Sequence, residues 1–442
     1  MPISSFYGLQ TSLRGLLAQQ RAMDTTGHNI ANASTVGYSR QEAMMAAAPA
    51  LTIPAGGIQS GAGAHLGSGV EVQDYRRVRD QFLDLQFRAQ AMRLGSESTR
   101  SEQLGRAEIA LAEPGDNGIA KQLEAFWNAW SDVANAPNDT AAREALIEQT
   151  KTLASAFGTV DSQLSMVAGQ ARADYEAITA PGGEIASIAG ELAALNGTIK
   201  SFVSAGESPN DLMDRRDVLL DKLSAFGQVS TIDAGSGSLR VTFGDAAEPL
   251  VDDTATNWPQ TLTAPGGKLG ALKEISGPGG TIESYRTQLN GIARTLADAV
   301  NAVHGGAGGG DFLTYAAGRE AATLTVAVTA ATLRTSATSA PGANETALQI
   351  AGLRGGGADN AYRGFVARIG IEVREAGRQR ANAQALHDAV DDRRQSISGV
   401  ALDEEMTNVI RFQRAYQASS RAMSTMDEML DVLINRTGRV GL

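Results

Sequence analysis

The last fifty residues of the chain contain its most regular pattern, an apolar repeat in alternating steps of three and four. The repeat consists of Val409, Phe412, Tyr416, Ser419, Met423, Met426, Leu430 and Leu433. Such spacing places these side chains on one narrow stripe of an α-helix, which is the seam of a coiled coil. Asp403, Glu404 and Glu405 precede the repeat, where carboxylates favour the positive end of a helix. The pattern therefore predicts a long helix that needs a partner.

A second, less complete repeat lies near the amino end. Its apolar members are Leu9, Leu13, Leu16, Met23 and Ile30, with Gln20 and Gly27 at the two missing heptad positions. Two helices with narrow apolar stripes, one at each terminus, can pair with each other and can also pack into a larger array. The alternative, in which both helices dock on one globular core, is compatible with the same spacing and stays open.

Between the termini, helix-favouring and strand-favouring segments alternate. Helical composition covers residues 76–225, 281–303 and 359–392, with breaks expected near 113–116, 136–138 and 180–183. Strand composition covers 226–272 and 311–352, and residues 49–75 predict a hairpin. We therefore predict a mainly α fold with a β-rich inserted domain. Its parts are terminal helices that form a coiled coil, an elongated helical body and a small outer β domain.

These segments predict three domains, each built from separate stretches of the chain. The inner coiled-coil domain is expected to comprise residues 1–48 with 393–442. The helical body is expected to comprise 49–225 with 273–310 and 356–392, and the outer domain 226–272 with 311–355. Both termini would then return to one end of the molecule.

The composition removes most kinds of chemistry. The 442 residues include no cysteine and only four histidines, and of these only His387 is followed three or four positions later by a carboxylate, Asp391. Such an isolated pair on a helix is more typical of a surface ion pair than of a metal site. We therefore assign no catalytic, cofactor-binding or metal-ligating residue, and we do not expect an enzyme. The net charge of −11 argues against nucleic-acid binding, and the apolar runs are too short for insertion into a membrane.

The charge is unevenly distributed along the sequence. Residues 1–40 carry a net charge of +2 and residues 393–442 carry +1, so residues 41–392 carry −14. One interpretation is that the ends are buried against neighbouring molecules while the acidic part faces solvent. The other is that this difference is compositional noise.

Three segments resemble the bacterial flagellar rod, hook and hook-associated proteins, and in detail the hook-associated protein 1 family. The amino-terminal segment is residues 29–41, which contain Asn29, Asn32, Gly37 and Tyr38. The carboxyl-terminal segment is residues 395–421, which contain Asp403, Glu404, Glu405, Gln413 and Tyr416. The third is internal, Ser-Pro-Asn-Asp-Leu-Met-Asp-Arg-Arg-Asp at 208–217. Rod and hook proteins share the terminal segments, whereas the internal segment within a long helical middle is more discriminating.

The resemblance implies a structural subunit that assembles at the distal end of the hook and joins hook to filament. Implied partners are the hook protein, a second junction protein (hook-associated protein 3), further copies of the chain, and an export chaperone that binds the carboxyl-terminal helix between Val409 and Leu433. The implied location is extracellular, in the flagellum, after export without a cleaved signal peptide. Alternatives are another axial subunit, of the hook or rod, and a surface adhesin. Because isolated seams need partners, we expect residues 1–40 and 395–442 to be disordered in the free monomer.

Overall fold

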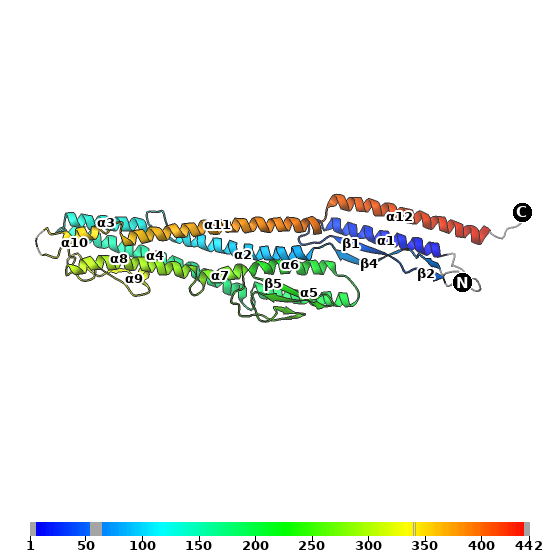
Figure 1. Cartoon of the computed structure of the whole chain (residues 1–442), viewed down its shortest axis with the longest axis horizontal. Coiled ribbons are helices and arrows are strands. Elements are labelled where there is room, and N and C mark those ends of the chain that lie inside the picture. Colours follow the sequence, from blue (N-terminus) through cyan, green and yellow to red (C-terminus); the bar gives the residue numbers. More distant parts are fainter. Residues whose placement is uncertain (1–5, 54–63, 339, 341, 437–442) are drawn as a thin grey trace.

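The computed structural model describes residues 6–53, 64–338, 340 and 342–436, and Figure 1 shows an elongated molecule. A pair of helices and a β-ribbon form one end, and a bundle of long helices extends to the other. A small four-stranded sheet with its own helices lies beside the middle. A mainly α fold is therefore confirmed. No helix among the described residues combines the length and apolar character that crossing a bilayer requires.

The terminal end is built from α1 (Tyr7–Ala31) and α12 (Leu402–Asp431), which lie side by side (Figure 1). The two helices are antiparallel, because Gly8 approaches Met426 while Gly15 approaches Ser419. A ribbon of β1 (Gln41–Ala47) and β4 (Val70–Arg77) packs along α1, and β2 (Leu51–Ile53) pairs with β3 (Ala64–Leu66). A π-helical turn, η1 (Val432–Arg436), follows α12.

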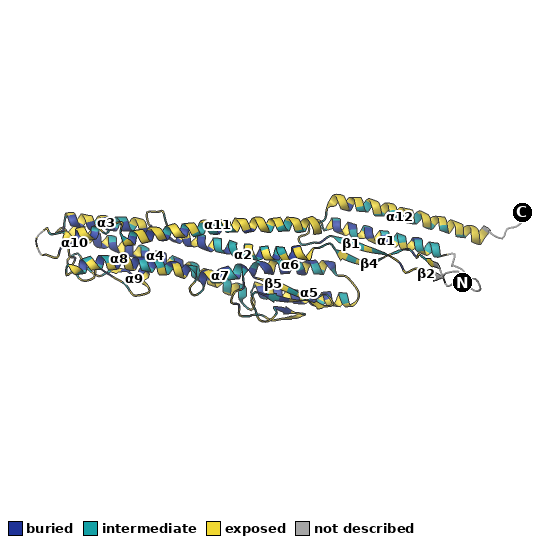
Figure 2. Cartoon of the chain, viewed as in Figure 1, coloured by how far each residue is buried: buried dark blue, intermediate teal, exposed yellow. Residues whose placement is uncertain are grey.

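The body consists of long helices around one apolar core. They are α2 (Gln81–Ala110), α3 (Ile119–Asn135), α4 (Thr140–Thr179), α8 (Thr281–Gly306) and α11 (Gly357–Ser398). Phe126, Trp127, Trp130 and Phe312 pack against one another in this core. Asp80 and Asp139 cap α2 and α4 by accepting hydrogen bonds from Phe82 N and Ala141 N. Figure 2 shows buried residues running through these helices, whereas α12 is mostly exposed.

The small sheet has a separate core. Its strands β5 (Val229–Gly235), β6 (Ser238–Phe243), β7 (Val251–Asp252) and β8 (Ala255–Thr256) are antiparallel and lie in sequence order. Three helices accompany it, α5 (Glu184–Ser204), α6 (Asn210–Phe226) and α7 (Gly267–Ser276). Buried side chains of the strands, such as Val241 and Phe243, pack with Leu192 and Leu220 of α5 and α6. The strands of the predicted 226–272 segment therefore lie within residues 229–256, and α7 occupies its end.

The prediction that residues 311–355 form the second half of a β-rich domain is wrong. The described residues of this segment form two short strands, β9 (Leu313–Thr314) and β10 (Thr325–Val326), and two short helices, α9 (Glu320–Thr323) and α10 (Glu345–Ala351). The two strands form a sheet separate from β5–β8, and Phe312, Leu333 and Ile350 belong to the core of the helical body. The threonine-rich composition suggested strands, but β-propensity reflects packing on a pleated surface, which this segment lacks.

The helix breaks are confirmed: α2 ends before the Pro-Gly segment at 114–115, α3 before Pro137 and α4 before Pro181. An additional break near Pro209 separates α5 from α6. The expected hairpin at 49–75 is longer than predicted, because its outer pairing joins Gln41 to Arg77. The terminal ranges 1–48 and 393–442 include residues 1–5 and 437–442, which lie outside the described residues.

Candidate functional site

The three segments with family resemblance meet in space, where the terminal helices join the body. Asn29, on the last turn of α1, is 1% exposed and lies at the centre of this junction. Its Nδ2 donates to Gln41 O at 2.9 Å and to Glu405 Oε2 at 3.1 Å. Its Oδ1 accepts from Tyr38 Oη at 2.8 Å and from Gln41 N at 2.9 Å. One buried amide thus connects α1, β1 and the first turn of α12.

Arg40 lies at the end of the loop between α1 and β1, and it connects this loop to the start of α12. Its guanidinium contacts Glu404 Oε2 at 3.2 Å and Glu405 Oε1 at 2.9 Å. Its backbone N donates to Ser398 O, the last residue of α11, at 2.8 Å. Glu405 is 1% exposed, so its charge is compensated within the protein. The loop after α1 therefore holds both the end of α11 and the beginning of α12.

The internal segment at 208–217 includes the start of α6, which contacts the junction from the other side. Ser39 donates to Asp214 from its backbone N at 2.8 Å and from its Oγ at 2.7 Å. Gln41 Nε2 donates to Asp211 Oδ1 at 2.8 Å, and Asn210 Nδ2 donates to Tyr75 O in β4 at 2.7 Å. The resemblance therefore marks residues that contact one another across the fold.

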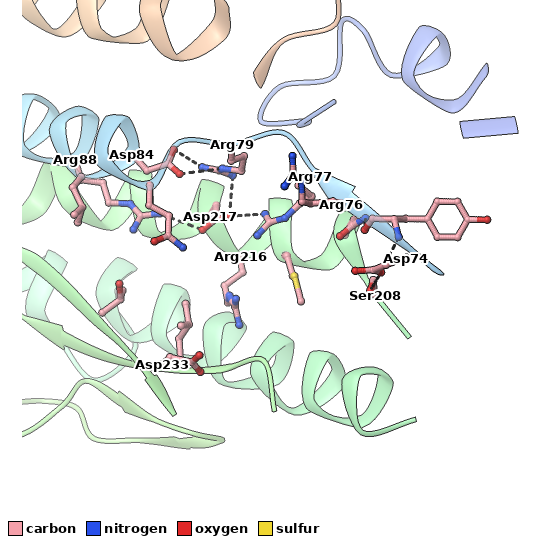
Figure 3. A pocket seen from close by; sticks show the side chains of 17 residues that line it. Asp74, Arg76, Arg77, Arg79, Asp84, Arg88, Ser208, Arg216, Asp217 and Asp233 are labelled. Atoms are coloured by element: carbon pink, nitrogen blue, oxygen red, sulfur yellow. Dashed lines mark hydrogen bonds and ion pairs between the residues drawn. The ribbon is translucent and has the colours of Figure 1, made fainter. Parts of the chain in front are cut away.

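Behind these contacts lies a buried cluster of alternating charges, which we call the arginine–aspartate cluster. It consists of Arg77, Arg79, Arg88 and Arg394 with Asp84, Asp214, Asp217 and Asp221. Asp217 lies in the middle and accepts from Arg77 Nη1 at 2.7 Å, Arg79 Nη1 at 2.8 Å and Arg88 Nη2 at 3.2 Å (Figure 3). The charges balance, and β4, α2, α6 and α11 each contribute to the cluster.

Burial and the neighbouring charges shift the pKa values of Asp217 and Arg79 in the cluster and of Tyr38 beside it. Burial alone would raise the pKa of Asp217, but Arg79, Arg77 and Arg88 outweigh it and lower that pKa below its usual range. Burial opposes the charge of Arg79 in the same way, yet Asp217 and Asp84 raise the pKa of its guanidinium. Tyr38 has a raised pKa because it is partly buried and lies near Asp211, Asp214 and Glu405. Asp217 and Arg79 are therefore charged near neutral pH.

The arrangement is suited to holding parts of the molecule together. The chain passes between terminal helices and body at residues 78–80 and 399–401, and the cluster and the Asn29 contacts flank both crossings. Within the described residues, no group of three or more histidine, aspartate and glutamate side chains is arranged to hold a metal ion. We therefore call this site the joint, defined as the Asn29, Arg40 and Asp214 contacts together with the arginine–aspartate cluster.

The predicted seam residues lie at different depths in the single chain. On α12, Val409, Phe412, Tyr416, Met423, Met426 and Leu430 are half-buried, and Leu433 is exposed. Since α12 packs on α1, this half-buried line is the face that meets α1. On α1, Leu9, Leu16, Met23 and Ile30 are half-buried and Leu13 is exposed. The fully buried residues of α1 are instead small or polar, namely Ser12, Ala18, Ala22, Thr26 and Asn29.

The remaining residues of the family segments lie around the joint. Asn32 donates from Nδ2 to His28 O at 3.1 Å and ends α1. Gly37 has φ +79° and lies against Val218 of α6. Asp403 and Gln413 are exposed on α12.

Sequence reasoning missed the arginine–aspartate cluster. One signal was present, because Asp214, Asp217 and Asp221 are three and four residues apart and therefore share one face of a helix. The partners of that face are not adjacent in sequence. Arg88 is on α2 and Arg394 near the end of α11, and only the fold brings them together.

Comparison with known proteins gives three matches, which include Asn29, Asp214 and Glu405 of the joint. Residues 104–264 match the family described as "Flagellar hook-associated protein FlgK helical domain". Residues 393–436 match "Flagellar basal body rod FlgEFG protein C-terminal", and residues 9–38 match "Flagella basal body rod protein".

Among curated proteins, flagellar hook-associated protein 1 of Bacillus subtilis is 29% identical over 98% of this chain and 99% of that protein. The Salmonella typhimurium and Escherichia coli proteins of the same name are 30% and 28% identical, over 66% and 64% of this chain. The chain's matches span only 55% and 50% of those two relatives. A solved structure titled as the flagellar hook junction protein FlgK from Burkholderia pseudomallei aligns with a TM-score of 0.45 and 22% identity, over 52% of this chain and 47% of that one.

Rod-type segments at both ends of a helical body define an axial structural protein of the bacterial flagellum. Within that class, the chain is similar to the flagellar hook-associated protein 1 family along nearly its whole length.

Proposed function

We propose that this chain is a non-catalytic subunit that assembles at the distal end of the hook and joins hook to filament. The observation that carries the proposal is the joint. Segments found in rod, hook and hook-associated proteins converge there on a single buried amide, Asn29, and on a balanced cluster of charges. A subunit that transmits force along a filament needs such a fixed connection between its inner helices and its outer body.

We propose further that the terminal helices form an inner coiled-coil layer with neighbouring subunits, and that the domain at 226–272 projects outward. Apolar side chains support this assignment, because Leu13 and Leu17 of α1 and Met406 and Ile410 of α12 are exposed in the single chain. Patches of exposed apolar residues on a monomer are typical of interaction surfaces. Other copies would then cover these exposed side chains and complete the seams from Leu9 to Ile30 and from Val409 to Leu433, while the half-buried line on α12 stays against α1 within the chain.

The partners that we propose are the hook protein, hook-associated protein 3, further copies of this chain, and an export chaperone that covers the apolar line on α12 before assembly. The proposed location is the hook–filament junction, outside the cell, reached by export without cleavage of a signal peptide. The apolar face of α12 supports the chaperone, because an amphipathic helix commonly docks in an apolar groove.

The match over 104–264 favours a hook-associated protein over a rod or hook subunit. A surface adhesin is less well supported, because the aromatic residues of the inserted segments face inward. Phe243 and Phe312 are buried, and Trp258 is half-buried with its Nε1 donating to Thr179 O at 3.1 Å.

The proposal is tested by deleting the gene and examining the cells by electron microscopy. We expect hooks without filaments and filament protein in the medium, with filaments restored when the gene is returned. Cells that lack hooks as well would instead indicate a rod or hook subunit. Normal filaments would contradict both assignments.

A further inference from the structure

A large apolar side chain stands out from the helical body at the end of α2. Ile109 is 79% exposed, the highest value among the large apolar side chains of the described body helices. Its neighbour Ala110 is buried, so Ile109 points away from the core. Glu108 is exposed beside it without an ion pair in the described part of the chain, whereas Glu102 is paired with Arg106. An isoleucine thus projects into solvent from an acidic turn.

A furrow of about 430 Å³ lies between α8 and α11, and we call it the α8–α11 furrow. Gly291 of α8 and Gly364 of α11 line it, and a Cβ atom added to either glycine would meet nothing within 4 Å. Its other apolar lining residues are Ile292, Ala361 and Phe365. Two helices that present small residues at their contact leave a hollow into which a side chain of a third helix can pack.

The charged lining residues of the furrow are both arginines, Arg294 of α8 and Arg368 of α11, and its described lining includes no carboxylate. Arg368 Nε lies 3.8 Å from Glu372 Oε1, one turn along α11. Arg294 is exposed and forms no ion pair among the described residues. Asp298, one turn along α8, instead accepts a hydrogen bond from Tyr315 Oη at 2.6 Å. Arg294 is therefore the positive charge of the furrow that has no ion-pair partner.

The projecting isoleucine and the furrow lie at the same level of the body but on different sides of it. Glu113 Oε1 accepts a hydrogen bond from Tyr362 Oη at 3.0 Å, and Glu108 Oε1 lies 3.8 Å from the position of a Cβ atom on Gly370. The end of α2 is therefore level with the stretch of α11 that lines the furrow. Since α4 and α11 each contact both α2 and α8, the latter two occupy different corners of the bundle. Ile109 points away from this bundle and does not reach the furrow of its own chain.

We propose that Ile109 of one copy inserts into the α8–α11 furrow of a neighbouring copy, with Glu108 beside Arg294. Charge supports a second copy as the occupant, because residues 102–113 contain three carboxylates and one guanidinium, whereas the furrow is lined by two guanidiniums. A projection and a hollow on different surfaces form a heterologous contact, which repeats from copy to copy and generates a ring or a helical array. The inference rests on the proposed function, which places copies of the chain side by side in the flagellum.

The test uses thiol crosslinking in isolated flagella, because the chain has no cysteine of its own. One variant combines Gly105→Cys, one turn before Ile109 and with open space around the new atom, with Thr295→Cys in the furrow. A short bismaleimide is expected to link different copies into dimers and longer ladders on immunoblots. Each cysteine alone should give no ladder, because a heterologous contact joins two different surfaces. Gly105→Cys with Ser162→Cys, an exposed position on α4 outside the furrow, is the matched control and should give none.

Further substitutions in the double-cysteine variant test the contact itself. Ile109→Asp should abolish the ladder, whereas Ile232→Asp, at a 60% exposed isoleucine of β5, should leave it unchanged. Arg294→Glu should reduce the crosslinking yield about fivefold, because it places two like charges together. Adding Glu108→Arg should restore the yield, since the exchanged pair is again of opposite charge. All of these substituted side chains are exposed, so the fold should tolerate the changes.

Three outcomes would overturn the inference: no ladder from the double-cysteine variant, an equal ladder from a single cysteine, or a ladder that Ile109→Asp leaves unchanged. Filament number and the presence of the chain at the hook tip are recorded on the same cells. If both are normal and the ladder is absent, the contact alone is wrong. If the unmodified chain is absent from hook tips, the proposed function fails as well.

Discussion

The side-chain amide of Asn29 donates a 3.1 Å hydrogen bond to the carboxylate of Glu405, two residues that lie 376 positions apart in the sequence. Both side chains are 1% exposed, and Glu405 is also 2.9 Å from the guanidinium of Arg40. The contact therefore aligns the end of the first helix with the start of the last one. It gives a physical reason for the presence of Asn29 and Glu405 in the family segments at the two ends of the chain.

Replacing Asn29 by alanine should weaken this alignment. The substitution removes four hydrogen bonds and leaves the Gln41 backbone and Glu405 with fewer partners, at a cost of about 3 kcal/mol. Asn29→Ala cells should carry far fewer filaments in electron micrographs than wild-type cells. Asn32→Ala, which removes two local bonds, one to His28 O and one from Thr35 Oγ1, is the control and should retain filaments. Equal filament numbers in the two variants would contradict a central role for Asn29.

The two seams show which part of the contact between α1 and α12 can be predicted from apolar spacing. The repeat from Val409 to Leu430 predicts the face of α12 that contacts α1, because a helix has a fixed period and one face can be read directly from spacing. On α1 the leucines suggested the contact, yet small residues such as Ala22 are fully buried there while Leu13 is 44% exposed. Periodicity identifies apolar faces, and it does not indicate which of two faces meets a given neighbour.

The joint shows the same limit. The resemblance singled out Asn29, Tyr38 and Glu405, which do meet, but no sequence pattern indicates that Arg394 Nη1 lies 2.6 Å from Asp221 Oδ2. Contacts between distant segments depend on how long helices pack, and no local pattern encodes their register. The wrong assignment of 311–355 has a related cause, because threonine-rich composition was interpreted without the packing that decides it.

Asp217 should be the most sensitive carboxylate of the joint. In Asp217→Asn the guanidiniums of Arg77, Arg79 and Arg88 lose their shared counter-charge in a buried place, and the free energy of unfolding should fall by about 3–5 kcal/mol. Urea denaturation followed by tryptophan fluorescence measures the change. Asp252→Asn is the control, since its pair with Arg240 is exposed and should contribute less than about 1 kcal/mol. Similar losses in the two variants would contradict the assignment.

The lowered pKa of Asp217 predicts that the free energy of unfolding depends on pH in the acid range. The folded-state pKa of Asp217 is lowered, so the stability it contributes is present above its unfolded pKa of about 3.9 and is lost as pH falls through the lower folded value. The free energy of unfolding should therefore decline below about pH 4 in the wild type. The decline should be shallower in Asp217→Asn, as measured by urea midpoints at several pH values. Parallel curves for the two proteins would show that Asp217 does not titrate as proposed.

Gly37 should tolerate no side chain. Its φ of +79° favours glycine, and a Cβ atom would lie 2.1 Å from Val218 Cγ2. Gly37→Ala should displace the loop that carries Tyr38 and Ser39 and cost about 2 kcal/mol or more. Gly27→Ala, in a helical position with open space around it, should be neutral or slightly stabilising. Swimming in soft agar compares the two, and normal swimming by Gly37→Ala would contradict the prediction.

The far end of the body depends on His304, which is fully buried. Its Nδ1 lies 2.8 Å from Gly310 O, and its Nε2 accepts from Arg334 N at 3.2 Å. A Cβ atom on Gly309 would lie 2.3 Å from the imidazole ring, so Gly309→Ala should force the ring out of place and cost about 2 kcal/mol. Gly306→Ala, where nothing lies within 4 Å of the new atom, is the control. Thermal unfolding should separate the two variants, and equal midpoints would contradict the role of His304.

The terminal helices should be unfolded in the free monomer and fold on assembly. Among the described residues α12 packs mainly on α1, the face of α1 is lined by small residues, and most of the outer surface of α12 is exposed (Figure 2). An isolated helix pair of this kind gains little from burial to offset the entropy of ordering. Backbone amides of Leu13 and Tyr416 should therefore exchange with solvent at nearly unprotected rates in the monomer, whereas those of Trp130 and Leu289 in the body core exchange slowly. Hydrogen exchange with mass spectrometry provides the measurement, with isolated flagella as the assembled reference. Strong protection at Leu13 and Tyr416 in the monomer would show that the α1–α12 pair is stable without neighbours.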